Sequence, residues 1–379
     1  MKILSLSTIP LLPHLGSGKT RLNWTNGLKN LGHEVRVLQP ADFELWPRFA
    51  RAKKYRQAIG ILLEVRTLLK RESFDIIEFY GDEFWLLLIW LHRQKSRPLM
   101  ISHVDGLELH DMEKEQRFWN PRHRLSNWIF RHTHYRFSKT TFQLADRYVC
   151  GCEDDLRYVI ENKYFQSEHA RCISPALDDE FHAVPFCKNK KPIILFLGSW
   201  IGRKGVRVIP EVITETLSRF PEYRFDIYGA SDSREAILTQ FPANLRDRVH
   251  VFDKLAKSEL LDGILAASIL FFPSYSEGFG LATVEAMACG CAVVTTRTGL
   301  GSDLIHNEEA ILCDFDDTVG MKNALASLIQ DENRRLSLAQ RGYEKVRTLQ
   351  WPLQVQKLEI AYAHWLRDWK QTGLEHASK

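Results

Sequence analysis

The strongest constraint on the fold is a series of short apolar segments that alternates with helical segments along most of the chain. Near-continuous apolar runs of this length are typical of strands that are buried on both faces of a parallel sheet. The first half contains such runs at residues 2–7, 35–38, 74–80, 98–104, 147–152 and 171–177. The second half contains them at residues 193–198, 223–228, 249–252, 269–273, 292–296 and 311–315. The pattern predicts an α/β fold with parallel sheets between layers of helices.

The series is interrupted once, at residues 184–192, where Pro, Lys and Asn replace residues that could pack in a core. A chain of 379 residues is also too long for one ordinary core. We therefore predict two doubly wound, Rossmann-like domains, at residues 1–185 and 190–352, that face each other across a central cleft. Ligands of open parallel sheets bind beyond the carboxyl ends of the strands, so the cleft is the expected active site.

Bulk properties exclude several classes of protein. The net charge of +4 is too small to indicate nucleic-acid binding by itself, although the positive excess lies in the first half. Residues 1–7 form too short an apolar run for a signal peptide, and the run at residues 84–91 is far shorter than the ~20 residues of a membrane span. Seven cysteines without a secretory signal suit a reducing compartment, so we expect a cytoplasmic protein.

Two cysteine pairs raise the question of a metal. Cys150 and Cys152, like Cys289 and Cys291, have one residue between them instead of two, and no second ligand pair follows. Each pair comes at the end of an element, where small residues pack. We therefore predict no metal site.

The first glycine loop, from Gly16 to Thr20, resembles a phosphate-binding P-loop. That motif requires a glycine at the position of Pro13, which has no N–H group, so we reject an NTPase. The loop joins a strand to a helix that Gly32 ends. Gly16 and Gly18 are candidate anion contacts at the start of that helix, although many α/β proteins use such a loop only to turn the chain.

The second loop follows the strand at residues 193–198 and carries two adjacent cations, Arg203 and Lys204. Cations beyond a parallel strand are well placed to hold a diphosphate. A solvated turn is the alternative interpretation of this loop.

The third loop follows the strand at residues 269–273 and contains Glu277, Gly278 and Gly280 before a short helix that Gly290 closes. Open amides at the start of this helix form an anion site. Glu277 and Glu285 are predicted to face one pocket. Carboxylates beside a phosphate site make sense if they accept hydrogen bonds from sugar or ribose hydroxyls. The alternative is a helix cap and a solvated surface residue.

At this point the chain resembles the family-four retaining glycosyltransferases, which have the GT-B fold. Glu277 and Glu285 match the paired-glutamate motif of the family, and residues 202–205, 16–18 and 32–35 match other family segments. The resemblance implies that the second domain binds a nucleotide-sugar and the first domain the acceptor. It also implies that the terminal helix, residues 353–379, crosses back onto the first domain.

The resemblance assigns roles to individual residues. It implies that Arg203 and Lys204 contact the diphosphate, and that Glu285 binds the ribose hydroxyls. It implies that Glu277 holds the donor sugar, together with the backbone amides that follow it. The predicted donor-binding set is Gly16, Gly18, Ser199, Arg203, Lys204, Glu277, Gly278, Phe279, Gly280, Leu281 and Glu285. Lys204, Glu277, Arg203 and His103 are the predicted catalytic residues.

The chain departs from the family at two positions. Ser199 stands where many members have an arginine, so the diphosphate depends on Lys204 and Arg203. Many members carry a histidine near the donor, and alignment places it on Asp105, with His103 two residues earlier. The sequence leaves open whether His103 or Asp105 reaches the donor, and a buried structural histidine is a third alternative.

We predict a retaining, metal-independent hexosyltransferase without a cofactor. By the resemblance to the family, it would move a sugar from a UDP-, GDP- or ADP-sugar to a glycan or glycolipid acceptor in cell-surface polysaccharide or lipopolysaccharide biosynthesis. The rivals are a sugar phosphorylase or sugar-phosphate synthase, and a non-catalytic glycan-binding scaffold. Residues 48–71 and 116–145 are basic and aromatic, which suits an anionic membrane surface or a phosphorylated acceptor, or else a solvated helical face.

Overall fold

The computed structural model describes residues 1–12, 16–49, 51–120, 124–252 and 255–377. Pro13 of the first glycine loop lies outside the described residues. So do residue 50 and residues 121–123 of the two basic segments, and the last two residues of the predicted terminal helix.

The first half of the chain forms a six-stranded parallel sheet in the order β2-β1-β3-β4-β5-β6. Its strands are β1 (Lys2–Ser7), β2 (Glu34–Leu38), β3 (Ile76–Tyr80), β4 (Leu99–His103), β5 (Arg147–Cys150) and β6 (Ala170–Cys172). Ile3 of β1 pairs with Val35 on one side and Ile76 on the other. All predicted strands are present. The last one is shorter than predicted and ends before Pro175, which has no N–H group for a strand ladder.

The second half forms another six-stranded parallel sheet, in the order β12-β11-β10-β7-β8-β9. Its strands are β7 (Lys191–Leu197), β8 (Arg224–Tyr228), β9 (Val249–Phe252), β10 (Ala267–Phe272), β11 (Ala292–Thr296) and β12 (Ile311–Cys313). Strand β7 begins inside the predicted linker, so the linker prediction was wrong at its end. The predicted α/β fold with two doubly wound parallel sheets is confirmed.

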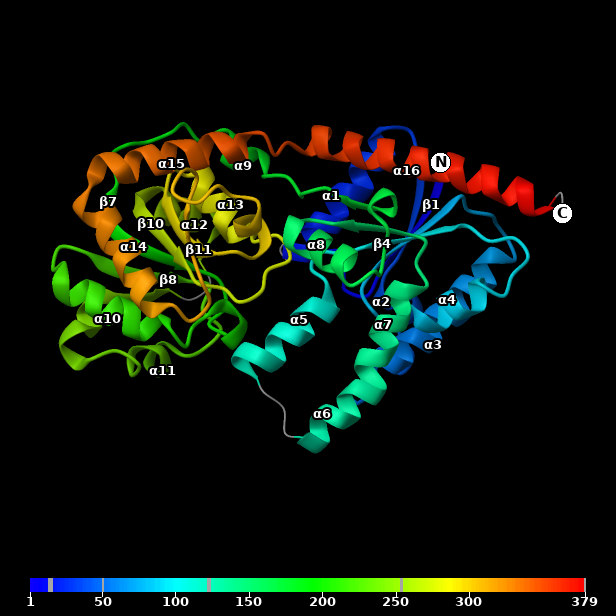
Figure 1. The fold of residues 1–379 in the computed structure, drawn as a ribbon, viewed down its shortest axis with the longest axis horizontal. Helices are drawn as coiled ribbons and strands as arrows, with labels where there is room; N and C mark the ends of the chain where they lie inside the picture. The colour runs from blue at the N-terminus through cyan, green and yellow to red at the C-terminus, as the bar shows by residue number, and fades with distance from the viewer. Residues whose placement is uncertain (13–15, 50, 121–123, 253–254, 378–379) are drawn as a thin grey trace.

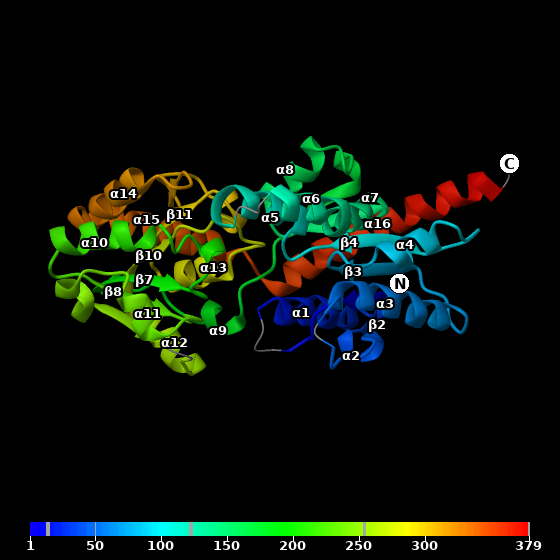
Figure 2. The same ribbon diagram turned by 90° about the horizontal axis from the view of Figure 1, so that it is seen from below.

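Helices cover both faces of each sheet (Figures 1 and 2). The first half contains α1 (Gly16–Asn30), α2 (Pro40–Phe43), α3 (Lys53–Leu69), α4 (Trp85–Leu91), α5 (Glu108–Lys114), α6 (Arg124–Phe130), α7 (Arg136–Gln143) and α8 (Glu153–Glu161). Helix α9 (Asp179–His182) follows, and its Phe181 packs in the core of the second sheet. The second half contains α10 (Ile209–Arg219), α11 (Arg234–Leu238), α12 (Lys257–Ala266), α13 (Leu281–Ala288), α14 (Thr318–Gln330) and α15 (Glu332–Arg347). Helix α4 is the buried helix that the apolar run at residues 84–91 predicts, because Leu87, Leu88 and Leu91 are all buried.

The last helix, α16 (Trp351–Ala377), leaves the second half of the chain and lies along the first sheet (Figure 1). Val355, Leu358, Tyr362 and Trp365 are buried in one core cluster with Trp24 of α1. These residues recur at intervals of three or four, which places them on one face of the helix. The packing ties the end of the chain to the half in which it begins, while the exact domain boundaries stay a prediction.

Candidate active site

The topology of the sheets decides where the three loops meet. In the second sheet the strand order reverses between β7 and β10, and in the first between β1 and β3. Loops that leave neighbouring strands at such a point diverge to opposite faces of the sheet and leave a crevice between them. The glycine segment from Gly16 to Thr20 forms the first turn of α1, which follows β1. The Arg203–Lys204 loop follows β7, and the Glu277 loop follows β10. All three sequence motifs therefore lie at the two switch points.

These loops enclose a cleft of about 650 Å³ between the two sheets. Its walls include residues from α1, from the loop between β4 and α5, and from the loops after β7 and β10. The predicted site residues that line it are Gly16, Asp105, Ser199, Arg203, Lys204, Glu277, Gly278, Phe279, Gly280 and Leu281. The structure thus brings together residues that are separated by more than half of the sequence.

Two glycines allow the walls to approach each other. Gly278 lies so close to the carbonyl of Asp105 that a Cβ atom at position 278 would overlap it. Gly205 has a φ of +74°, and a Cβ atom there would overlap the carbonyl of Pro273. Only glycine fits both positions. Gly278 permits contact between the two halves of the chain, and Gly205 holds the β7 loop against the β10 loop.

Lys204 and Glu277 form an ion pair at the centre of the cleft. The Lys204 Nζ atom lies 2.6 Å from Oε1 and 2.8 Å from Oε2 of Glu277. Both side chains are largely buried, and Ser274 also donates a hydrogen bond to Glu277. The β7 loop is held in place because the Tyr275 amide donates to the Arg203 carbonyl at 2.8 Å. The cation is therefore fixed close to the carboxylate.

The start of α13 faces the same space. Gly280 caps this helix with a φ of 85° and has no side chain that could bind the first amides. The residues from Gly278 to Ala282 line the cleft. Amides at a helix start carry partial positive charge and bind anions. The cleft therefore combines Arg203, Lys204 and a helix start on the side of the second sheet.

The two glutamates line adjoining cavities: Glu277 lines the cleft. Glu285 lines a second cavity of about 690 Å³, which adjoins the cleft and shares Gly16, Thr20 and Leu281 with it. Residues 277 and 285 diverge because the first precedes α13 and the second lies inside it. Burial, reinforced by the nearby Asp178 carboxylate, raises the pKa of Glu285 to about 7.

Besides Glu285, two predicted residues do not line the cleft. Gly18 is buried at the start of α1, where a Cβ atom would lie 2.7 Å from the Pro10 carbonyl, so it serves the packing of the loop. His103 is buried in the interior, and its Nδ1 atom lies 2.9 Å from the Tyr80 hydroxyl and 3.8 Å from Glu78. Of the pair left open by the sequence, Asp105 lines the cleft and His103 does not.

Sequence reasoning missed several residues that line the cleft, and two of these form hydrogen bonds there. Arg21 lies on α1, and its Nε atom donates to Asp105 at 2.6 Å while Nη1 donates to Ser7 at 2.8 Å. Asp111 of α5 accepts a hydrogen bond from the Ser276 hydroxyl across the cleft. Arg21 lies in the same helix as the glycine loop, which was the only available signal. No sequence pattern pairs Asp111 with a serine in the other half of the chain.

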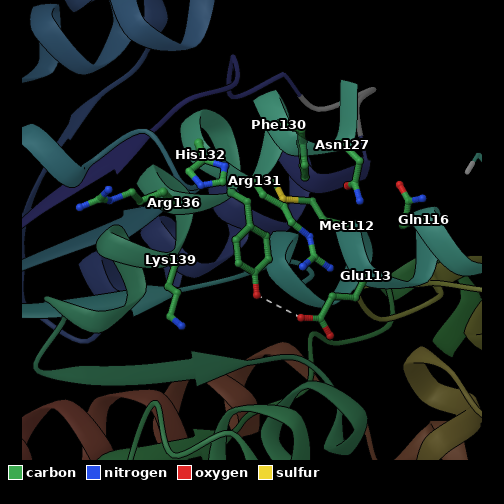
Figure 3. Close-up of a pocket in the computed structure, with 10 residues that line it drawn as sticks. Met112, Glu113, Gln116, Asn127, Phe130, Arg131, His132, Arg136 and Lys139 are labelled. Atoms are coloured by element: carbon green, nitrogen blue, oxygen red, sulfur yellow. Dashed lines mark hydrogen bonds between the residues drawn. The ribbon is translucent and has the colours of Figure 1, made fainter. Parts of the chain in front are cut away.

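A separate pocket of about 580 Å³ is shown in Figure 3, and none of its lining residues lines the cleft. It is enclosed by α5, by α6 and α7, and by two π-helical turns, η1 (Glu115–Trp119) and η2 (Arg131–Tyr135). Tyr135 donates a hydrogen bond of 3.1 Å to Glu113, and Arg131, Arg136 and Lys139 are further lining residues. This outer pocket belongs to the basic segment that the sequence singles out.

Two further properties concern the described residues alone. They include no group of three or more His, Cys, Asp or Glu side chains that is arranged to hold a metal ion. Nor do they include a helix of sufficient length and apolar character to cross a membrane.

Comparison with solved structures defines the class of fold. Sucrose-phosphate synthase from Thermosynechococcus elongatus superimposes with a TM-score of 0.77 at 18% identity, over 97% of this chain and 100% of that one. HepE of Anabaena, solved in complex with UDP, superimposes with a TM-score of 0.70 at 15% identity, over 96% and 100%. WaaG, a glycosyltransferase involved in lipopolysaccharide biosynthesis, gives 0.69 at 17% identity, over 94% and 98%. The fold is GT-B.

Sequence comparison then gives the family. Residues 16–181 match the family model Glycosyltransferase Family 4, and residues 178–345 match Glycosyl transferases group 1. The chain belongs to the family-four glycosyltransferases, as its motifs predict.

Curated relatives match only part of the chain. D-inositol 3-phosphate glycosyltransferase of Xylanimonas cellulosilytica is 31% identical over 167 residues, which are 42% of this chain and 39% of the relative. A glycosyltransferase of Methanocaldococcus jannaschii is 27% identical over 158 residues, 41% of this chain and 44% of the relative. The chain thus matches about two fifths of the length of these relatives.

Proposed function

We propose that this protein is a retaining glycosyltransferase that moves a sugar from a nucleotide-sugar to an acceptor bound in the cleft. The observation that carries the proposal is the position of Lys204, fixed 2.6 Å from Glu277 next to the amide-lined start of α13. A cation, open amides and a carboxylate at one place match the diphosphate and the hydroxyl groups of a nucleotide-sugar.

The two adjoining cavities suit the two parts of the donor. The diphosphate would lie against Lys204, Arg203 and the start of α13. The nucleoside would occupy the second cavity, where Glu285 accepts hydrogen bonds from the ribose and Leu255, Leu260 and Leu281 offer apolar contact. The sugar would lie between Glu277 and the acceptor side of the cleft. Ser199 lines this cleft and leaves the diphosphate to the two cations.

The reaction breaks the bond between the sugar C1 atom and the diphosphate oxygen and forms a bond from C1 to the acceptor oxygen. The nucleoside diphosphate leaves with the bonding electrons and receives the proton of the acceptor hydroxyl. Negative charge grows on the leaving oxygen, and preorganised cations and amides stabilise such charge most effectively in a water-poor cleft. Arg203, Lys204 and the α13 amides can supply this stabilisation without a metal or cofactor, so EDTA is expected to leave turnover unchanged.

We further propose that the acceptor is a glycan or glycolipid precursor of the cell surface and that the enzyme works at the cytoplasmic face of a membrane. Helix α6 lies at a tip of the molecule in Figure 1. It exposes Leu125, Trp128 and Ile129, of which Leu125 is 71% accessible. Exposed apolar side chains within a basic segment suit the interface of an anionic bilayer.

A nucleotide screen tests the proposal directly. UDP, GDP and ADP would each be added in a thermal unfolding experiment, and one is expected to raise the melting temperature. A ligand at 100 times its Kd stabilises the folded state by about 2.7 kcal/mol. The matching sugar nucleotide should then be hydrolysed slowly without an acceptor, which a glycan-binding scaffold would not do. Absence of both binding and hydrolysis would contradict the proposal.

A further inference from the structure

The acceptor side of the cleft differs in charge from the donor side. Arg203 and Lys204 lie on the side of the second sheet, whereas Asp105, Glu108 and Asp111 line the opposite wall. Asp105 is paired with Arg21 at 2.6 Å, and Asp111 accepts a hydrogen bond from Ser276. Glu108 differs from both, because its Oε2 atom is buried and has no hydrogen-bond partner among the described residues.

Such an atom is costly in a folded protein. A buried polar atom without a partner destabilises the folded state by about 1–3 kcal/mol, so it calls for an explanation. Glu108 is the first residue of α5 and lines the cleft with Gly106, on the loop where Gly278 of the other half makes contact. Because it lines the cleft, Glu108 is a candidate contact for a molecule that enters between the two walls.

The groups around Glu108 determine which kind of ligand its carboxyl group can bind. Burial, together with the carboxylates of Asp82 and Glu83, raises the pKa of Glu108 well above its usual range. A carboxyl group that keeps its proton can both donate and accept hydrogen bonds, as sugar hydroxyls do.

Among the residues that the structure describes, the cations on and beside this wall are already paired with carboxylates. Arg21 is paired with Asp105, and the neighbouring Lys54 lies 2.8 Å from Asp82. Burying an anion without a free cation is unfavourable.

We propose that Glu108 binds a hydroxyl group of the acceptor and that the part of the acceptor inside the cleft is an uncharged or amino sugar, without a phosphate group. This inference rests on the proposed function, since it names the acceptor for the same cleft. Phosphate groups of the acceptor, or of a lipid that carries it, remain outside, on the side of α5 that faces the basic outer pocket in Figure 3. Helix α5 thereby separates a sugar-binding wall from a basic one.

The test uses Glu108→Leu, which keeps the approximate size of the side chain and removes its hydrogen-bonding atoms. Binding of methyl glucopyranoside, glucosamine and glucose 6-phosphate would be measured by saturation-transfer NMR, with the nucleoside diphosphate that the screen identifies already bound. Wild type should bind the first two sugars better than the phosphate ester. Glu108→Leu should weaken both about 10-fold, the scale of one hydrogen bond in a buried site. Glu161→Leu, on the exposed end of α8, is the control and should bind them as wild type does.

Two more measurements distinguish a binding role of Glu108 from a structural one. Because Glu108→Leu removes a buried atom without a partner, its melting temperature should equal or exceed that of wild type, whereas a structural role for Glu108 predicts a lower one. Its affinity for the nucleoside diphosphate should not change. The inference is overturned if wild type binds none of the three probes, if it prefers glucose 6-phosphate, or if Glu108→Leu binds them unchanged. Failure of wild type to bind any nucleoside diphosphate would contradict the proposed function instead.

Discussion

At the scale of single residues, the ion pair between Lys204 and Glu277 is expected to affect both the stability of the protein and its catalytic rate. Both side chains are largely buried, so each compensates for the cost of burying the other. A bound diphosphate would compete with Glu277 for the same ammonium group. The ion pair therefore keeps the Lys204 ammonium group in position before the donor binds. The ammonium group can then stabilise the negative charge that develops on the leaving group.

Lys204→Ala should lower turnover about 100-fold, the scale of losing one preorganised donor at a transition state. It should also lower the free energy of unfolding, because Glu277 is left buried without its cation. The double variant Lys204→Ala, Glu277→Gln should recover stability without recovering turnover. Rates of nucleoside diphosphate release and urea unfolding curves check both effects. Near-normal turnover of Lys204→Ala would contradict a diphosphate role.

Glu285 should reduce stability at neutral pH. Its pKa is about 7 in the folded protein, compared with about 4.3 for an exposed glutamate. The folded state therefore binds more protons than the unfolded state between these values, and stability falls as the pH rises through that window. At pH 8, Glu285→Gln should be more stable than wild type by about 1–3 kcal/mol. At pH 4.5 the difference should be small.

Urea unfolding of Glu285→Gln and wild type at both pH values gives the comparison. A gain in stability of equal size at pH 4.5 and pH 8 would show that the ionisation of Glu285 is not its cause. A stabilising variant that loses donor affinity would be typical of a binding residue that costs stability in the free protein.

The sequence predicted the loop residues of the site better than those beneath it. Glycines, paired cations and the two glutamates form local patterns that can be recognised in the sequence without knowledge of the tertiary contacts. His103 and Asp105 could not be separated, because the choice depends on where β4 ends and on Tyr80 and Glu78, which belong to the neighbouring strand. Arg21 was missed because its partners lie elsewhere in the sequence: Ser7 ends β1, and Asp105 belongs to the loop after β4.

At the scale of elements, α16 is the clearest case of a helix whose position depends on tertiary contacts. Trp365 is buried and its indole N–H donates to the Glu168 carbonyl at 3.0 Å. The Tyr362 hydroxyl donates to the fully buried Glu78 at 2.6 Å. The helix therefore packs on the first sheet and donates a hydrogen bond to a buried carboxylate, although in sequence it comes after the second sheet.

Trp365→Ala should lower the free energy of unfolding by about 3–5 kcal/mol, because it leaves a large cavity between α16 and the first sheet. Ile360→Ala is the matched control, since Ile360 lies on the same helix with 58% of its surface exposed. That variant should stay within about 0.5 kcal/mol of wild type. Chemical denaturation of the two variants provides the measurement, and equal losses would mean that α16 is not docked through its Trp365 face.

The positions of all the strands could be predicted, because a strand buried on both faces of a parallel sheet forms a continuous apolar run in the sequence. Their ends were less certain. Strand β7 starts at Lys191, inside a segment whose composition indicates a linker. Backbone pairing with β8 and β10, not the polarity of the side chains, sets that boundary. The π-helical turns η1 and η2 have no sequence signal, because they depend on how α5, α6 and α7 pack around the outer pocket.

At the scale of the whole molecule, charge and apolar exposure are unevenly distributed. The positive excess belongs to the first half of the chain, and α6 exposes three large apolar side chains there. We expect binding to vesicles that contain anionic lipid at low salt, and weaker binding as salt is added, because each Lys or Arg near the surface contributes only about 1 kcal/mol. Trp128→Ser should weaken sedimentation with vesicles and leave nucleoside diphosphate affinity unchanged. Equal binding to neutral and anionic vesicles would contradict an electrostatic contribution.

We propose that the cleft and its adjoining cavity hold one nucleotide-sugar, with Glu277 at the sugar and Glu285 at the ribose. Calorimetric titration of both Gln variants with the nucleoside diphosphate and with the full donor tests it most directly. Glu285→Gln should weaken both ligands by about 1.5–3 kcal/mol, the scale of a hydrogen bond to a charged group. Glu277→Gln should bind the nucleoside diphosphate as wild type does, yet turn over the donor slowly. If both variants bind the nucleoside diphosphate as tightly as wild type and keep full turnover, the two glutamates are structural and the account is contradicted.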